Sequence, residues 1–339
     1  MKKGFILASA VLSSALASTS SWAATEEVNV YSYRQAYLIE PIMAEFTEQT
    51  GVKVNIVFAK DGLVERLERE GKLSPADLVL TTDISRSIEL VEKDLVQPVQ
   101  SDALEGNIPA AYRDPADQWF ALTKRVRNVY SSKERLGKLP TLNYEDLADA
   151  KFKGKICTRS GKHDYNVALI SSMIVAHGEA ETKTWLEGVK ANLARTPQGN
   201  DRDQVKAIKE GFCDVSFGNN YYLGNMLEDK AQVSWANAVE INFPNQANRG
   251  THVNISGVSL TKFAPNKDNA VKLMEFLSGD AAQKIYAEVN FEYPVKPGVA
   301  VSKLVASWGE FKADPIPLSE IAKQRPVALK LLDEVKFDL

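Results

Sequence analysis

The sequence predicts an α/β protein of two lobes built on mixed, mostly parallel sheets, and three observations lead to this class. Strand-like and helix-like segments alternate from Glu27 onward. Behind an N-terminal leader of 23 residues, about 316 residues remain, which exceeds what one hydrophobic core comfortably holds. Two strand-like segments, Trp119–Val129 and His252–Val258, are placed to cross from one lobe to the other and back. They predict a hinge of two crossing strands.

The N-terminus has the pattern of a secretory signal peptide over residues 1–23. Lys2 and Lys3 precede an apolar run, and Ser21-Trp22-Ala23 is a small-x-small cleavage site. The run is shorter than the ~20 residues that span a bilayer, and no later segment matches it, so we expect a soluble exported chain without a membrane span. Cleavage removes two lysines and no acid, so the formal charge changes from −3 to −5, which argues against a nucleic-acid partner.

The first elements form a βαβ unit. Glu27–Ser32 alternates like a strand, and Val52–Phe58 repeats this pattern after a helix that Gly51 ends. Such parallel units bind ligands at the carboxyl ends of their strands. Arg34 and Tyr37 follow the first strand directly, so both are candidates for contact with a ligand.

The remaining elements are divided between the two lobes. We assign 24–124 and 253–299 to lobe 1, and 125–252 and 300–339 to lobe 2. Lobe 1 then gains a helix at 61–70, a strand at 77–80, a helix capped by Thr82 and Asp83, and a helix from Asp268. Lobe 2 contains strands at 155–157 and 213–217 and helices at 167–177 and 201–211.

Two adjacent tyrosines, Tyr221 and Tyr222, follow the strand at 213–217. Neighbouring side chains diverge in a strand, but at the first turn of a helix capped by Asn219 or Asn220 both hydroxyls can lean over the helix end. Phenols ionise near pH 10, so phenolates near neutral pH require a strong local cation such as a hard trivalent metal. Tyr165 also follows a strand at a helix start, which allows three phenols to share one cleft. Packing of half-buried tyrosines is the alternative reading.

Two cysteines are present, Cys157 and Cys213. In an exported protein an even count favours one disulfide, which here would join the two strands that lead to the tyrosines. A catalytic thiol is the alternative.

Several segments resemble the periplasmic ferric-iron-binding proteins of ABC importers, and the resemblance covers essentially the whole chain behind the leader. They are Lys153–Arg159, Tyr165-Asn166, Gly199–Arg202, Asn219–Gly224, Arg249–Gly257 and Asn290–Pro294. The resemblance implies a type II periplasmic binding protein: a two-lobed monomer without catalytic activity that delivers ferric iron from the periplasm to an inner-membrane ABC permease. It places Tyr165, Tyr221 and Tyr222 on the iron-ligating tyrosines of that family.

One segment departs from the common family pattern. Many members carry Ser-Arg-His-Tyr after the first strand, whereas this chain has Tyr33-Arg34-Gln35-Ala36-Tyr37. With Gln35 in the place of the histidine, the chain is similar to the subgroup in which three tyrosines bind iron together with carbonate or bicarbonate. Arg34, Arg125 and Gln35 are then expected to bind this anion, and Tyr37 is a possible contact from lobe 1.

Two other functions stay open from the residues alone. A protein of this fold could bind an organic or oxyanion solute if the tyrosines stack or donate hydrogen bonds instead of ionising. An exported enzyme is the third reading, but the sequence has no nucleophile elbow, no phosphate-binding loop and no dinucleotide fingerprint.

Overall fold

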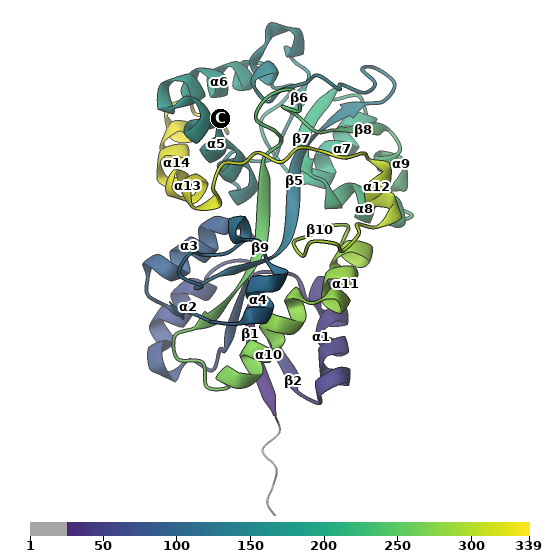
Figure 1. The fold of residues 1–339 in the computed structure, drawn as a ribbon. Helices are drawn as coiled ribbons and strands as arrows, with labels where there is room; N and C mark the ends of the chain where they lie inside the picture. Colours follow the sequence, from purple (N-terminus) through teal and green to yellow (C-terminus); the bar gives the residue numbers. More distant parts are fainter. Residues whose placement is uncertain (1–25) are drawn as a thin grey trace, which may run out of the picture.

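The computed structural model describes residues 26–339, so the signal peptide predicted at residues 1–23 lies outside the described residues. The chain folds into two lobes connected by two long strands, β5 (Phe120–Ser132) and β9 (Val253–Thr261), which run side by side between them (Figure 1). The predicted two-lobed α/β class is confirmed. Within residues 26–339, no helix is long and apolar enough to cross a membrane.

The sheet of lobe 1 begins with a parallel βαβ unit. Strand β1 (Glu27–Ser32) pairs in parallel with β2 (Lys53–Phe58) on one side and with β3 (Leu78–Thr81) on the other. Strand β3 pairs antiparallel with β9, which in turn pairs antiparallel with β5. The short strands β4 (Val96–Gln97) and β10 (Tyr293–Pro294) add to β9 and β5.

Lobe 2 is built around the second half of β5. That half lies between β7 (Val215–Asn219) and β8 (Val239–Asn242), both antiparallel to it, and β6 (Ile156–Cys157) pairs in parallel with β7. Antiparallel pairs therefore outnumber parallel pairs among the described strands, so the expectation of mostly parallel sheets was wrong. The reason is that β5 and β9 carry the chain out of lobe 1 and back in opposite directions, and each imposes antiparallel pairing on its neighbours.

Helices cover both sheets. In lobe 1 they are α1 (Ala36–Thr50), α2 (Leu63–Glu70), α3 (Ile84–Glu92), α4 (Asp102–Asn107), α10 (Lys267–Ser278) and α11 (Asp280–Asn290). In lobe 2 they are α5 (Asp164–His177), α6 (Glu179–Ala191), α7 (Asp201–Lys209), α8 (Tyr221–Glu228) and α9 (Val233–Ala236). The tail adds α12 (Lys303–Ser307), α13 (Leu318–Lys323) and α14 (Arg325–Glu334).

Each lobe has its own hydrophobic core. The main core of lobe 1 gathers side chains of β1, β3, α1, α10 and the first half of β5. Lobe 2 has two clusters, one between β5, α5, α6 and α14 and one between β5, α7, α8 and β9. Separate cores joined by two strands are the construction in which lobes commonly move about a hinge, so β5 and β9 are the expected hinge.

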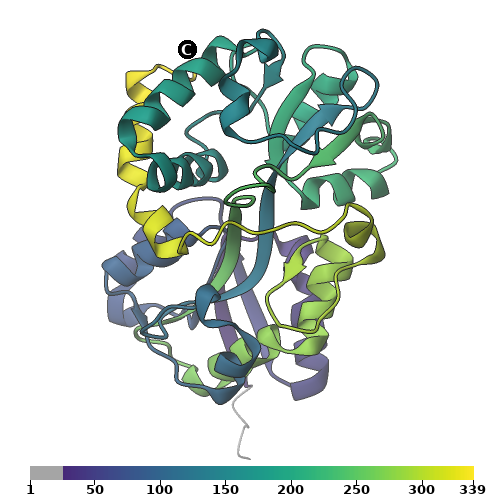
Figure 2. The same cartoon turned by 45° about the horizontal axis from the view of Figure 1, so that its top comes forward.

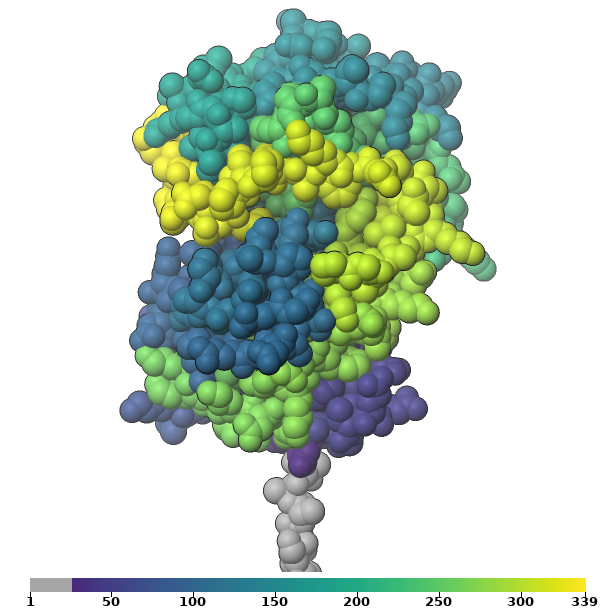
Figure 3. Space-filling view, viewed as in Figure 1, coloured from purple at the N-terminus to yellow at the C-terminus, as the bar shows by residue number. Residues whose placement is uncertain are grey.

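The C-terminal tail runs across the junction between the lobes, as the yellow segment in Figure 2 and Figure 3 shows. Helix α14 packs on α5 and α6 of lobe 2. Helix α13 contacts both α3 and α5, and its Leu318 and Ile321 belong to the core of lobe 1. The tail therefore touches both lobes. The division of residues between the lobes stays a prediction.

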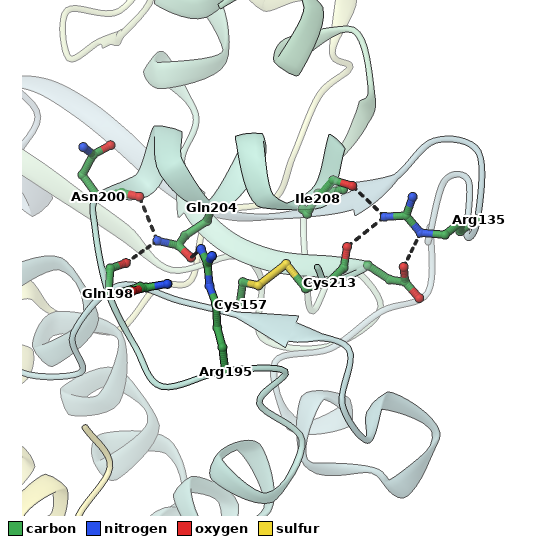
Figure 4. The surroundings of a disulfide bond; sticks show 9 residues. Arg135, Cys157, Arg195, Gln198, Asn200, Gln204, Ile208 and Cys213 are labelled. Atoms are coloured by element: carbon green, nitrogen blue, oxygen red, sulfur yellow. Dashed lines mark hydrogen bonds and ion pairs between the residues drawn. A yellow bond between two sulfur atoms is a disulfide. The ribbon is translucent and has the colours of Figure 1, made fainter. Parts of the chain in front are cut away.

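Cys157 and Cys213 form a disulfide, as predicted. Cys157 ends β6 and Cys213 lies two residues before β7, so the bond ties together the strands that precede α5 and α8 (Figure 4). On one side of the disulfide, Arg135 donates hydrogen bonds to the carbonyl oxygens of Ile208 and Cys213 at 2.7 and 2.8 Å. The disulfide and these hydrogen bonds therefore connect β6, β7 and the end of α7 to one another.

Candidate metal centre

The three predicted tyrosines lie together in one cavity between the lobes. Tyr165 is in the first turn of α5, and Tyr221 and Tyr222 open α8. The hydroxyl oxygens of Tyr165 and Tyr221 are 3.3 Å apart, and the ring centroids of Tyr221 and Tyr222 are separated by 4.3 Å. All three line a cavity of about 630 Å³. Three phenol oxygens are therefore available at one place, from two helix starts.

The expected helix start is correct, but the expected cap is not. Asn220 occupies the position before α8, yet its side chain makes no capping hydrogen bond. Its Oδ1 accepts from the Val126 backbone N–H at 2.9 Å, and its Nδ2 donates to the Phe291 carbonyl oxygen at 3.0 Å. The reason is that this asparagine is fully buried between β5 and the segment after α11, where those backbone groups need partners. It fixes the tyrosine pair to the hinge.

Burial keeps Tyr221 and Tyr222 protonated when no cation is bound. Burial, followed by the neighbouring Tyr165 and Tyr222, raises the pKa of Tyr221 well above that of a free phenol, whereas Arg125 acts in the opposite direction. Burial, followed by Tyr165 and Asp201, also raises the pKa of Tyr222, while Arg159 lowers it. Only a strong Lewis acid in the cavity can ionise these phenols at neutral pH.

A buried polar network that the sequence reasoning missed supports the tyrosines from behind. Arg127 on β5 contacts Asp201 at 2.7 Å, Asn166 Oδ1 at 2.6 Å and Asn219 Oδ1 at 3.1 Å. Asn166 follows Tyr165 directly, and Asn219 ends the strand before the tyrosine pair. One guanidinium therefore positions both tyrosine-bearing helices. The i, i+2 spacing of Arg125 and Arg127 on a strand was the available signal, because it puts both on one face.

The predicted anion-binding residues reach the same cavity, but they differ in how they are engaged. Arg34 is 2% exposed and forms a two-point ion pair with Glu292, with nitrogen–oxygen distances of 3.2 and 2.9 Å. Arg125 is as deeply buried, and its Nη2 is 3.9 Å from Glu292 Oε1. Within residues 26–339, Nε and Nη2 of Arg125 have no hydrogen-bond partner. Arg125 is thus the better donor for an anion.

Gln35 and Tyr37 line the lobe 1 side of the cavity. Gln35 immediately precedes α1, and its side chain makes no capping hydrogen bond to the helix. Tyr37 is 59% exposed and lies in the first turn of α1. The structure brings both residues to the cavity, and their direct contact with a ligand stays a prediction.

The cavity is basic and has no clustered carboxylate, imidazole or thiol ligands. Its charged lining comprises seven cations and three acids: Arg34, Lys60, Arg86, Arg125, Arg159, Lys162, Arg202, Asp61, Asp164 and Glu292. Across the described part of the chain, no group of three or more His, Cys, Asp or Glu side chains could hold a metal ion. His163 is taken up as the cap of α5, where Nδ1 accepts from the Tyr165 N–H at 3.3 Å. Phenol oxygens are the hard ligands that remain.

One ion pair joins the two lobes at the cavity lining. Arg86 on α3 of lobe 1 contacts Asp164 on α5 of lobe 2 at 3.0 Å, and it also contacts Asp61 at 3.0 Å. Asp164 binds Arg325 of α14 on its other oxygen at 2.8 Å. Since Asp164 directly precedes Tyr165, the contact between the lobes is anchored beside the tyrosine site.

Comparisons with known proteins identify the family of the chain. The model of the family described as "Bacterial extracellular solute-binding protein" matches residues 74–311. Iron uptake protein A1 of Synechocystis sp. is 44% identical over 312 residues, which cover 91% of this chain and 87% of that protein. The crystal structure of apo ferric ion-binding protein A of Pasteurella haemolytica superimposes with a TM-score of 0.90 at 60% identity, over 93% of this chain and 99% of that one.

A Trichodesmium protein whose structure contains iron and citrate ligands superimposes with a TM-score of 0.87 at 40% identity, over 92% of this chain and 99% of that one. The resemblance predicted from the sequence motifs is therefore confirmed. The chain belongs to the bacterial extracellular solute-binding protein family, alongside these iron uptake and ferric ion-binding proteins.

Proposed function

We propose that this protein captures ferric iron in the periplasm through the phenolates of Tyr165, Tyr221 and Tyr222, together with a synergistic carbonate or bicarbonate, and delivers it to an inner-membrane ABC permease. The observation that carries the proposal is the meeting of three phenol oxygens, from two helix starts, in a basic cavity between two lobes. Relatives named as iron uptake and ferric ion-binding proteins support the choice of cargo.

Charge balance explains why the cargo is trivalent. Three phenolates supply three negative charges, which neutralise one ferric ion and occupy about half of an octahedral shell. Ionisation of three crowded phenols is unfavourable until such a cation arrives, since the hydroxyl oxygens of Tyr165 and Tyr221 are 3.3 Å apart. A divalent ion would leave a net negative charge in a partly dry site, so ferric iron fits better than ferrous iron.

An oxyanion fits the remaining coordination positions. Carbonate and bicarbonate are small enough to lie between the metal and the cationic wall of the cavity. Arg125 has buried nitrogen donors without a partner among residues 26–339, and Gln35 and Arg34 lie on the same wall. Arg125 therefore makes the main contact, and Arg34 contributes its charge while it stays paired with Glu292.

Transport follows from the two-lobed construction. The lobes move about β5 and β9 and close over the loaded site, with the contact between Arg86 and Asp164 joining their facing surfaces. The closed form is what the permease recognises, and opening releases the iron. The predicted signal peptide at residues 1–23 directs the chain to the periplasm.

A ferric titration tests the proposal. Protein is titrated with ferric citrate, with and without bicarbonate, while the visible phenolate absorption band is followed. We expect Tyr221→Phe and Tyr222→Phe to abolish tight binding with little change of shape, and Arg125→Gln mainly to weaken the bicarbonate dependence. Tyr112→Phe, which alters a tyrosine outside the cavity lining, is the matched control and should behave like wild type.

Retained iron binding in the tyrosine variants would contradict the proposal. If the Tyr221 and Tyr222 variants keep the full band and affinity, the phenols are not the iron ligands. A wild-type protein that gives no band at all would instead mean that the cavity binds an organic or oxyanion solute, which its basic lining selects.

A further inference from the structure

Asn290–Pro294 is one of the sequence segments that resemble the ferric-iron-binding proteins, but none of its residues is among the proposed ligands. The structure holds it firmly between the lobes. Phe291 adopts a left-handed backbone conformation (φ 56°) at the end of α11, and the Asn290 side chain donates to the Leu38 carbonyl oxygen at 3.1 Å. Across the hinge, Asn220 donates to the Phe291 carbonyl oxygen at 3.0 Å.

Packing against α8 fixes the same segment from a second side. A Cβ at Gly224 would lie 2.3 Å from Phe291 Cγ, so only glycine lets the phenyl ring approach α8 this closely. A non-glycine residue with positive φ is uncommon and persists where its surroundings hold it. These contacts hold the segment in one position, and its residue in the cavity lining is Glu292.

Glu292 lies on the anion side of the cavity. Its carboxylate, whose side chain is 4% exposed, binds Arg34 through two hydrogen bonds and lies 3.9 Å from Arg125. The other acids of the lining are engaged elsewhere, since Asp61 and Asp164 pair with Arg86. Arg34, Arg125 and Glu292 thus form one charge cluster of two cations and one anion.

The charge of this cluster decides which anion fits beside the metal. Ferric iron and three phenolates sum to zero, so the charge that the anion meets is set by the protein groups nearest to it, and Arg34, Arg125 and Glu292 are the most deeply buried of the charged lining groups. Two arginines without Glu292 would present two positive charges and favour a doubly charged anion. With Glu292 in place one positive charge remains, and in a partly dry cleft an unbalanced charge is costly.

We infer that Glu292 is a specificity-determining residue, which leaves Arg34 and Arg125 with one net positive charge and thereby selects a singly charged oxyanion, bicarbonate over carbonate, as the partner of iron. This inference rests on the proposed ferric function. It gives the Asn290–Pro294 segment a role, because a carboxylate that tunes two arginines must be held at a fixed distance from both.

Oxamate and oxalate test the inference, since they are nearly isosteric chelators that differ by one charge. Iron binding is measured in carbonate-free buffer by the visible phenolate band, with each anion in turn, and the ratio of the oxalate to the oxamate affinity is compared between proteins. Glu292→Gln adds one net positive charge with little change of shape, so this ratio should rise at least about tenfold over wild type. Glu288→Gln removes an exposed acid of α11, the helix that precedes Glu292, and should leave the ratio unchanged.

Two further variants separate charge from local damage. Arg34→Gln leaves Arg125 facing Glu292 with no net charge, so the ratio should fall at least about tenfold. The double variant Arg34→Gln/Glu292→Gln restores one net positive charge, and its ratio should return close to that of wild type. Arg34→Gln, which keeps Glu292, decides the question even if Glu292→Gln fails to fold.

The outcomes distinguish this inference from the proposed function. A wild-type protein that forms no phenolate band with any anion overturns the ferric function itself. A normal band in wild type, combined with the same oxalate-to-oxamate ratio in all variants, overturns the role of Glu292 and leaves the ferric function standing.

Discussion

Iron binding should release one proton from each ligating tyrosine, and the structure explains why. Free phenol ionises near pH 10, and burial raises the pKa of Tyr221 and Tyr222 further, so these groups are protonated at pH 7 before iron arrives. The hydroxyl oxygens of Tyr165 and Tyr221 are 3.3 Å apart, which corresponds to a repulsion of about 5 kcal/mol between two phenolates at an effective dielectric constant of 20. This repulsion opposes ionisation as long as no cation is present. Because each tyrosine ligates the metal as a phenolate, three protons leave when the metal binds.

The size of the pH effect follows from this proton count. Three protons per iron lower the affinity about a thousandfold for each unit of pH decrease near neutrality, or about 4 kcal/mol. The direction of the effect follows from the raised pKa values of Tyr221 and Tyr222, because protons compete with iron for the phenolates. Iron is therefore lost on acidification. The Tyr222→Phe variant has one titrating ligand fewer, so its affinity should fall only about a hundredfold per pH unit.

Competition with a ferric chelator at pH 6.5, 7.0 and 7.5 measures both slopes. The pH dependence of the chelator is common to wild type and variant, so it cancels from the difference. The residual binding of Tyr222→Phe is followed at high protein concentration, with Tyr112→Phe as the matched control. Identical slopes for wild type and Tyr222→Phe would mean that Tyr222 does not ionise on the metal, and the reasoning from buried phenols would be wrong.

Three other perturbations have defined outcomes. The Cys157–Cys213 disulfide closes a loop of 56 residues, so its reduction should lower the free energy of unfolding by about 4 kcal/mol in the chain-entropy model. Denaturant unfolding with and without reductant measures this loss, and unchanged unfolding midpoints would contradict it. Burial, followed by Arg249 and Arg127, lowers the pKa of His252 to about 3, below the ~6.5 of an unfolded histidine, so the unfolded chain gains a proton that the folded protein does not. From pH 7 to pH 5 wild type should then lose about 2 kcal/mol more stability than His252→Gln, and equal losses in denaturant titrations would refute this. Arg86→Met removes the contact with Asp164 between the lobes. We expect this variant to have a larger radius of gyration without iron in small-angle scattering, and to bind iron up to about fivefold more weakly. An unchanged scattering curve would show that this ion pair does not hold the lobes together.

Much of the candidate site could be predicted because its signals are local. Tyr165, Tyr221 and Tyr222 each follow a strand and open a helix, and such starts are visible in a few residues of sequence. The disulfide followed from the count of two cysteines in an exported chain and from the strands that they flank. The parallel unit of β1, α1 and β2 was likewise evident from hydrophobic periodicity and from Gly51 at the helix end.

What the sequence by itself determined is therefore the order of the elements, the cysteine pair and the helix starts that carry the three tyrosines, because periodicity, caps and residue chemistry act over short distances. Only the tertiary structure decided the antiparallel pairing around β5 and β9, the use of Asn220 as a tie to Phe291, and the pairing of Arg34 with Glu292, which are 258 residues apart. Each depends on where the chain returns after crossing between lobes. Local propensity carries no information about that return, since the partners of a buried polar group are set by packing in three dimensions.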